Sequence, residues 1–128
     1  MAQINSNLYA SFQQVFLRFA DKVALTTTSG VEHTYSSLDN ESARLARYLS
    51  EQGIQPGDRV SVQVEKSPEA LWLYLACLRG GFVFHPLNTG YKENELEYYF
   101  SDAEPSVIIC DVSADQLMRK LAEKTNIA

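Results

Sequence analysis

Residues 59–88 read RVSVQVEKSPEALWLYLACLRGGFVFHPLN, and they contain the pattern on which the fold depends. Val60–Val64 alternates apolar and polar side chains, which predicts a strand. The tripeptide Ser67-Pro68-Glu69 is typical of a helix start, because serine caps free amides, proline suits the first turn and glutamate favours the positive end of the helix dipole. The helix 70–79 is apolar almost all round, which predicts burial. With a second short strand at Phe82–Leu87, the stretch predicts a β-α-β unit.

The same alternation continues on both sides of this unit. Helical spacing predicts helices at 7–20, 37–52 and 92–103, and a last helix that Ser113 caps. Strand-forming residues predict a hairpin of 23–28 with 32–35, and a strand at 107–110. We therefore expect an α/β fold of alternating β-α units with a mostly parallel sheet, and no linker marks a second domain.

Details of individual helices follow from the same spacing. The first helix is expected to begin at Asn7 and to bury one stripe, which consists of Leu8, Phe12, Val15, Phe16 and Phe19. The second helix should end at Gly53, in the left-handed conformation that glycine tolerates. The helix of 92–103 is expected to point Leu96, Tyr99, Phe100 and Ala103 inward, and its start at Lys92 lacks the usual capping side chain.

Composition excludes several classes of function. The 128 residues carry a net charge of −5, which is unfavourable for binding nucleic-acid phosphates. The longest apolar run, Ala70–Leu78, is far shorter than the roughly 20 residues of a membrane span. No signal peptide is recognisable in Met1–Asn5, so we expect a cytoplasmic protein with no membrane span.

Catalytic motifs are scarce. The segment Thr26–Gly30 is rich in Thr, Ser and Gly like a phosphate loop, but it lacks a lysine, which favours a plain hairpin turn. Cys77 and Cys110 are expected to be reduced core residues, since they have no Cys-x-x-Cys spacing. His33 and His85 have no acidic partner at ligand spacing, so a zinc site is not predicted.

Three further features have a structural and a functional interpretation. His85 could carry a proton at the end of a strand, but a packed histidine is favoured. Arg79 could contact a substrate, but a cation at the C-terminal end of a helix dipole is favoured. The group Tyr91, Tyr98, Tyr99 and Phe100 could stack on a ligand; helical spacing favours core packing for Tyr99 and Phe100 and leaves Tyr98 more exposed.

Several motifs taken together resemble the adenylate-forming acyl-CoA synthetase family. The longest is Leu78–Asn88, which is similar to the family's Leu-Lys/Arg-Ala-Gly-x-x-Tyr-x-Pro-Leu/Ile-Asn/Asp motif. Thr34–Leu38 resembles its Thr-Tyr-x-Glu-Leu motif, and the run Pro86–Tyr91 is most like the malonyl-CoA synthetase branch. The departures are Ser37 for Glu, Gly80 for Ala, Phe84 for Tyr, and Lys92 where a capping Thr or Ser is usual.

This resemblance implies an ATP-dependent acid–CoA ligase that also uses Mg²⁺ and CoA. In such relatives the phosphate loop, the adenine and ribose sites and the C-terminal lysine all lie beyond the region that this chain resembles. The basic stretch that contacts CoA in some relatives corresponds to Asp111–Asp115, which has no basic residue. No catalytic, cofactor-binding or metal residue is therefore assigned here, and residues 1–128 are expected to be the N-terminal portion of an AMP-binding domain, inactive by itself.

The substrate expected from the resemblance is a small carboxylic acid, with malonate or methylmalonate first. Another acyl-CoA or aryl-CoA ligase branch is a second hypothesis, and a self-standing α/β module for binding or assembly is a third. Because apolar faces would lie partly unpaired without the rest of the domain, self-association of the isolated chain is also expected.

Overall fold

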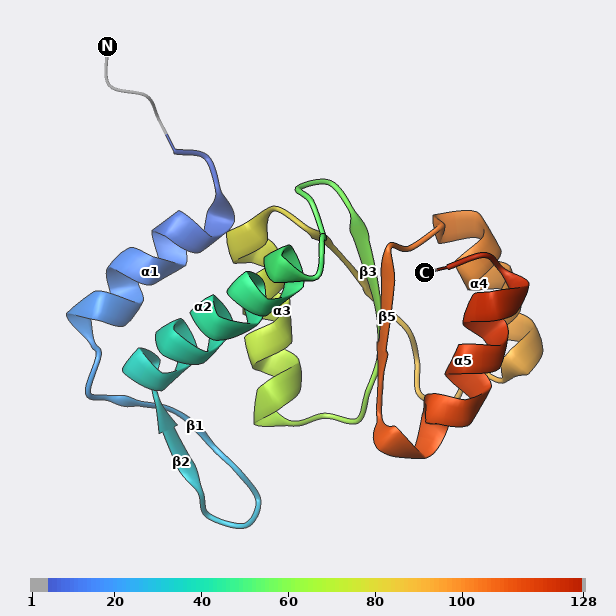
Figure 1. Ribbon diagram of the computed structural model, residues 1–128. Helices are drawn as coiled ribbons and strands as arrows, with labels where there is room; N and C mark the ends of the chain where they lie inside the picture. Colours follow the sequence, from blue (N-terminus) through green and yellow to red (C-terminus); the bar gives the residue numbers. More distant parts are fainter. Residues whose placement is uncertain (1–4, 128) are drawn as a thin grey trace. The chain divides into compact units, whose positions relative to one another are not determined.

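The computed structural model describes residues 5–127, and these form two compact units (Figure 1). The first unit comprises the residues up to Gly53 together with Ser67–Gly81, and the second comprises Ile54–Lys66 and the residues from Phe82 onward. The chain passes from one unit to the other at directly adjoining residues. The sequence contains no linker and so predicts one domain. The contacts within the folded chain nevertheless divide it into two units.

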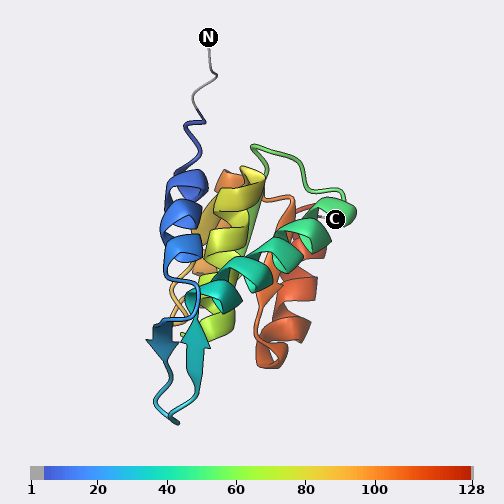
Figure 2. The same ribbon diagram turned by 90° about the vertical axis from the view of Figure 1, so that its left-hand side faces the viewer.

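The first unit is made of three helices and a hairpin. Its elements are α1 (Leu8–Arg18), β1 (Val23–Thr26), β2 (Glu32–Thr34), α2 (Tyr35–Glu51) and α3 (Pro68–Gly80). Strands β1 and β2 pair antiparallel, as predicted, and Figure 2 shows the hairpin projecting from the ends of α1 and α2. The core of this unit centres on Tyr9, Leu38 and Leu75.

Side-chain caps explain where the helices of the first unit begin. Asn7 accepts a hydrogen bond from the Tyr9 amide, and Ser67 accepts one from the Ala70 amide, as predicted. The predicted start of α2 is wrong by two residues. The Thr34 hydroxyl accepts a hydrogen bond from the Ser37 amide, so the helix begins at Tyr35. The aromatic side chain of Tyr35 had led to its prediction as the last residue of the preceding strand.

The predicted buried stripe of α1 is only partly correct. Phe12 and Phe16 pack against the core, but Leu8 and Val15 are each 49% exposed, and Tyr9 is 3% exposed in their place. Leu8 and Tyr9 are neighbours in the sequence. Helical periodicity alone therefore does not decide whether the buried stripe includes Leu8 or Tyr9. The partners of the Tyr9 hydroxyl decide the orientation of the helix, as described below.

The second unit contains a three-stranded parallel sheet. Its elements are β3 (Arg59–Gln63), β4 (Val83–Pro86), α4 (Glu93–Ala103), β5 (Val107–Cys110), a 3-10 turn at Val112–Ala114 and α5 (Asp115–Lys124). The strand order is β4-β3-β5, so β3 is central. Ile108 and Cys110 of β5 pack with the core of α4 and α5, so these helices cover one face of the sheet. That core consists of Leu87, Leu96, Phe100, Met118 and Leu121.

One predicted helix start in this unit is wrong, and another is better specified than the sequence suggested. Ser113 lies inside the 3-10 turn, and α5 begins at Asp115, so the predicted serine cap is wrong. The start of α4 is better specified than Lys92 suggested, because the Glu95 side chain accepts a hydrogen bond of 2.5 Å from the Lys92 amide.

The predicted glycine stops are confirmed. Gly53 follows the end of α2 with φ of 92°, and Gly81 caps α3 with φ of 71°. Across the part of the chain that the structure describes, there is no helix with the length and apolar character to cross a membrane.

Candidate functional site

The most concentrated polar cluster of the first unit surrounds the carboxylate of Asp39. One oxygen, Oδ1, accepts a hydrogen bond from Arg79 Nη1 at 2.8 Å, from the Tyr9 hydroxyl at 2.5 Å and from Gln13 Nε2 at 3.3 Å. The side chains of Arg79 and Asp39 are 22% and 16% exposed. A single carboxylate therefore joins α1, α2 and α3.

The ring of Tyr9 forms the centre of this cluster. The Arg79 guanidinium carbon lies 4.4 Å from the ring centroid, which adds a cation–π contact to the ion pair. The Tyr9 hydroxyl also lies 3.3 Å from Ser42 Oγ, which is fully buried. The Tyr9 phenol and the Arg79 guanidinium are therefore each held in place by more than one interaction.

Electrostatics support the ionised form of Asp39 and the neutral form of Tyr9. Burial acts to raise the pKa of the Asp39 carboxyl, but hydrogen bonds from Tyr9 and Arg79 outweigh burial and hold that pKa below its usual value. Burial, followed by the hydrogen bond to Asp39, raises the pKa of the Tyr9 phenol. The cluster is thus a stable arrangement of fixed charge rather than a proton donor poised for neutral pH.

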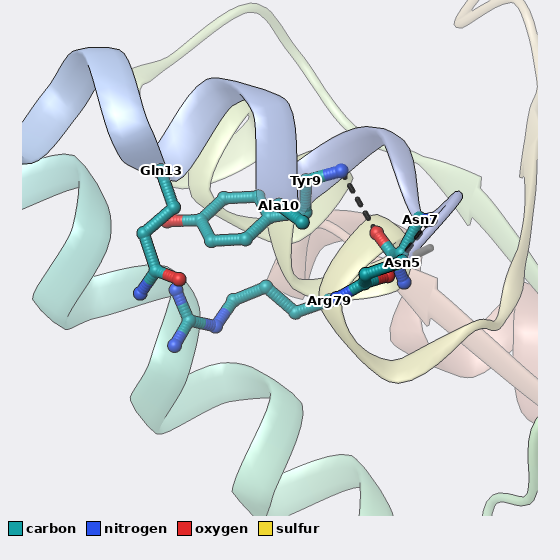
Figure 3. Close-up of a pocket in the computed structure, with 6 residues that line it drawn as sticks. All are labelled: Asn5, Asn7, Tyr9, Ala10, Gln13 and Arg79. Carbon is teal, nitrogen blue, oxygen red and sulfur yellow. Dashed lines mark hydrogen bonds between the residues drawn. The ribbon is translucent and has the colours of Figure 1, made fainter. Parts of the chain in front are cut away.

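A polar pocket of about 250 Å³ lies beside this cluster (Figure 3). Its lining residues are Asn5, Asn7, Tyr9, Ala10, Gln13 and Arg79. Figure 3 shows the Arg79 side chain running alongside the Tyr9 ring toward Gln13. Both ends of the Asn7 amide are engaged, because Oδ1 accepts from the Tyr9 amide and Nδ2 donates to the Leu78 carbonyl. The walls are therefore built mainly from side chains that hold the helices together.

The sequence favours a structural role for Arg79 at the end of a helix. In the structure, Arg79 lies in the last turn of α3. Neither Tyr9 nor Asp39 was predicted from the sequence to belong to this cluster. The sequence could have indicated a partly buried Asp39, because this residue lies between Leu38 and Ser42 at the border of the buried face of α2. No comparable signal marks Tyr9.

His85 lies in the second unit and contacts Ser61 on the neighbouring strand. Its Nδ1 is 2.7 Å from Ser61 Oγ, and its ring meets the Tyr99 ring edge-on at 6.4 Å. Ser61 is fully buried and Gln63, on the same strand, donates to the Asn88 carbonyl at 2.9 Å. This is the packed histidine that the sequence favoured.

The tyrosine group divides between core and surface. Phe100 is 1% exposed and Tyr98 is 65% exposed, as the helical spacing predicted. Tyr99 is half-buried, and its ring stacks on Tyr91 at 5.0 Å and meets Tyr98 edge-on at 5.4 Å. The rings of His85, Tyr91 and Tyr98 thus all contact the ring of Tyr99.

The two cysteines are free and differ in exposure. Cys77 is fully buried in α3, and burial raises the pKa of its thiol to about 11. Cys110 is half-buried, and burial, followed by the nearby Asp115 and Asp111, also raises its thiol pKa. Both therefore lack the stabilised thiolate of a reactive cysteine.

Thiol labelling should report this difference. At neutral pH we expect a maleimide or disulfide reagent to modify Cys110 first, and Cys77 at least about a hundredfold more slowly, because Cys77 must wait for local or global opening. Mass spectrometry of the labelled peptides measures both rates, with the urea-unfolded chain as the control in which they converge. Equal rates in the native chain would show that Cys77 is accessible.

The hairpin turn of Thr26–Gly30 does not have the free amides of a phosphate loop. In the hairpin turn, the Gly30 amide donates to the Thr27 carbonyl and the Val31 amide donates to Thr27 Oγ1, so these amides are satisfied within the turn. Across 5–127, no group of three or more His, Cys, Asp or Glu side chains could hold a metal ion. No chemical step through ATP or Mg²⁺ can therefore be assigned to these residues.

A family comparison accounts for the motifs. The family model described as AMP-binding enzyme matches residues 12–127, which is nearly the whole chain. The chain belongs to the AMP-binding enzyme family. Apo MatB from Rhodopseudomonas palustris is 41% identical with a TM-score of 0.87, and the match covers 98% of this chain and 25% of that chain. The same protein has been solved with ATP bound.

Other members of the AMP-binding family agree with this assignment. The N-terminal subdomain of NpsA from Klebsiella oxytoca has a TM-score of 0.77 at 29% identity, over 83% of this chain and 28% of that chain. The medium-chain fatty-acid–CoA ligase of Escherichia coli K12 is 33% identical over 100 residues, which are 78% of this chain and 18% of that protein. The resemblance to acyl-CoA synthetases is confirmed, and the chain spans less than a third of each of these three relatives.

Proposed function

We propose that this chain is the N-terminal portion of the adenylation domain of an ATP-dependent acid–CoA ligase. The observation that carries the proposal is the match to MatB, which covers 98% of this chain at a TM-score of 0.87. The acyl-CoA ligases among the curated relatives support the same reaction class. The proposed partner of the chain is the remainder of its own enzyme, and its proposed location is the cytoplasm.

The proposed reaction has two steps. A carboxylate oxygen of the acid attacks the α-phosphorus of ATP, and the bond to the β-phosphate breaks, which releases pyrophosphate and leaves an acyl-adenylate. The thiol of CoA then attacks the acyl carbon, and AMP leaves with the electron pair of the broken acyl–oxygen bond. Mg²⁺ would neutralise phosphate charge in the full-length enzyme.

For the acid we propose malonate or methylmalonate. The run Pro86–Tyr91, which resembles the malonyl-CoA synthetase branch, supports this choice. The test is kcat/KM of the full-length enzyme for malonate, methylmalonate, octanoate and benzoate. A preference of at least about tenfold for the two diacids is expected, and a higher value for octanoate or benzoate would assign the chain to another ligase branch.

The isolated chain is expected to release no pyrophosphate above background. The reason is that the family resemblance puts the phosphate loop and the adenine site beyond the region that this chain resembles. In addition, no group of three or more His, Cys, Asp or Glu side chains among residues 5–127 could hold a metal ion. Purified chain is mixed with malonate, ATP, Mg²⁺ and CoA, and pyrophosphate is followed by a coupled assay with the full-length enzyme as the positive control. Sustained turnover by the purified chain would contradict the prediction.

We further propose that the isolated chain associates with itself. Several large apolar side chains are 45% exposed or more, which leaves surface that association can bury. They include Leu17 at 64% and Val83 at 48%. Sedimentation over a range of concentrations tests this property, and a constant monomer mass would contradict it.

A further inference from the structure

A ring contact inside the first unit joins the hairpin to α3. The ring of His33, on β2, and the ring of Trp72, on α3, meet edge to face, with centroids 5.6 Å apart and planes at 77°. Trp72 packs beside the core of Tyr9, Leu38 and Leu75, and His33 is half-buried. The contact therefore connects two elements that lie far apart in the sequence.

The indole nitrogen of Trp72 is a buried donor without an ordinary acceptor. Its Nε1 is shielded from solvent, and no oxygen or nitrogen atom among residues 5–127 accepts a hydrogen bond from it. A buried N–H that donates to nothing is costly, and such groups are rare in folded proteins. The surroundings of this N–H must therefore explain why it is tolerated.

The face of an aromatic ring can accept such a donor. Ring faces carry negative and ring edges positive partial charge, and N–H groups form weak hydrogen bonds to the faces. With the Nε1 edge of Trp72 directed at the face of His33, the ring contact supplies the missing acceptor. The reverse arrangement, with the His33 edge on the indole face, would leave the indole N–H unpaired.

The charged and titratable groups around His33 are exposed or engaged elsewhere. Glu32 beside it and Glu69 in the first turn of α3 are exposed, and β1 has no charged residue. Asp39 of α2 is held in the polar cluster described above. The remaining groups lie against aromatic rings, Tyr35 against Phe16 and Lys22 over Phe19. Among the described residues, none of these groups pairs with His33.

We propose that Trp72 Nε1–H donates to the ring face of neutral His33, and that protonation of His33 breaks this contact. An imidazolium ring carries positive charge on its face as well as its edge, so it repels the donor. Histidine ordinarily changes charge between about pH 5 and pH 8, and the attachment of the hairpin to α3 loosens as the pH falls through this range. The proposal concerns the first unit alone and does not depend on the proposed function.

A spectroscopic test is direct because the chain contains one tryptophan and two histidines. In a proton–nitrogen NMR spectrum at about pH 8, the Trp72 Nε1 proton should lie upfield of its position in the urea-unfolded chain, because it sits over a ring face. Acidification to about pH 5 should move this signal toward the unfolded position, while circular dichroism shows that the helices persist. This measurement needs no variant, and a signal that does not move with pH would overturn the proposal.

Three variants separate the acceptor ring from its charge. His33→Phe keeps a ring face that cannot be protonated, so the upfield position should persist at both pH values. His33→Gln removes the ring, so the upfield shift should be lost at both. His85→Gln is the control in the second unit and should titrate like the unmodified chain.

Circular dichroism reports whether each variant is folded. A folded His33→Phe variant whose indole signal still moves with pH would show that His33 is not the titrating group. A folded His33→Gln variant that retains the upfield signal would show that His33 is not the acceptor. Either result would overturn the proposal.

Discussion

Replacing Phe100 by alanine is expected to destabilise the second unit by about 3–5 kcal/mol. The ring is 1% exposed and packs with Leu96, Met118 and Leu121 between the sheet and its two helices. Its removal leaves a cavity that the surrounding strands and helices cannot fill. A natural domain is stable by only about 5–15 kcal/mol, so the loss is a large share of the total.

Urea unfolding followed by circular dichroism measures this change. Tyr98→Ala is the matched control, because it removes a similar ring from the same helix at a position that is 65% exposed. The control should stay within about 0.5 kcal/mol of the unmodified chain. Equal effects of the two variants would mean that Phe100 does not lie at the centre of this core.

Replacing Asp39 by alanine is expected to cost the first unit about 2 kcal/mol, the second largest effect on stability that we anticipate. The substitution removes the acceptor shared by Arg79, Tyr9 and Gln13, and it leaves the guanidinium of Arg79, 22% exposed, without its ion pair. Arg44→Ala is the control on the same helix: its side chain is 78% exposed and pairs with Glu41, so a change below about 0.5 kcal/mol is expected.

The Asp39 prediction has a pH dependence with a definite sign. The folded pKa of Asp39 lies below its ordinary value of 3.8, so the ionised carboxylate contributes stability above that value. This contribution is lost as the pH falls through the folded pKa. Asp39→Asn should therefore flatten the acid limb of the stability curve below about pH 4. An acid limb of unchanged slope would show that other carboxylates dominate there.

Much of the fold could be predicted because its signals are local. The strand at Val107–Cys110, the serine cap before α3 and the glycine stops at Gly53 and Gly81 each depend on a few neighbouring residues. The errors at Tyr35 and Ser113 are also local. The Thr34 side chain caps α2 directly before Tyr35, and a 3-10 turn that contains Ser113 precedes α5. The family motifs are strings of this kind, which is why they led to the AMP-binding family.

The sequence by itself determined the order of helices and strands, the parallel α/β class and the family. Only the tertiary structure decided which face of α1 is buried, because the Tyr9 hydroxyl finds Asp39 30 residues away. The same holds for the pairing of Asp39 with Arg79, 40 residues apart. The physical reason is that periodicity and capping act within a few residues. Burial of a polar group depends instead on partners that the folded chain brings together.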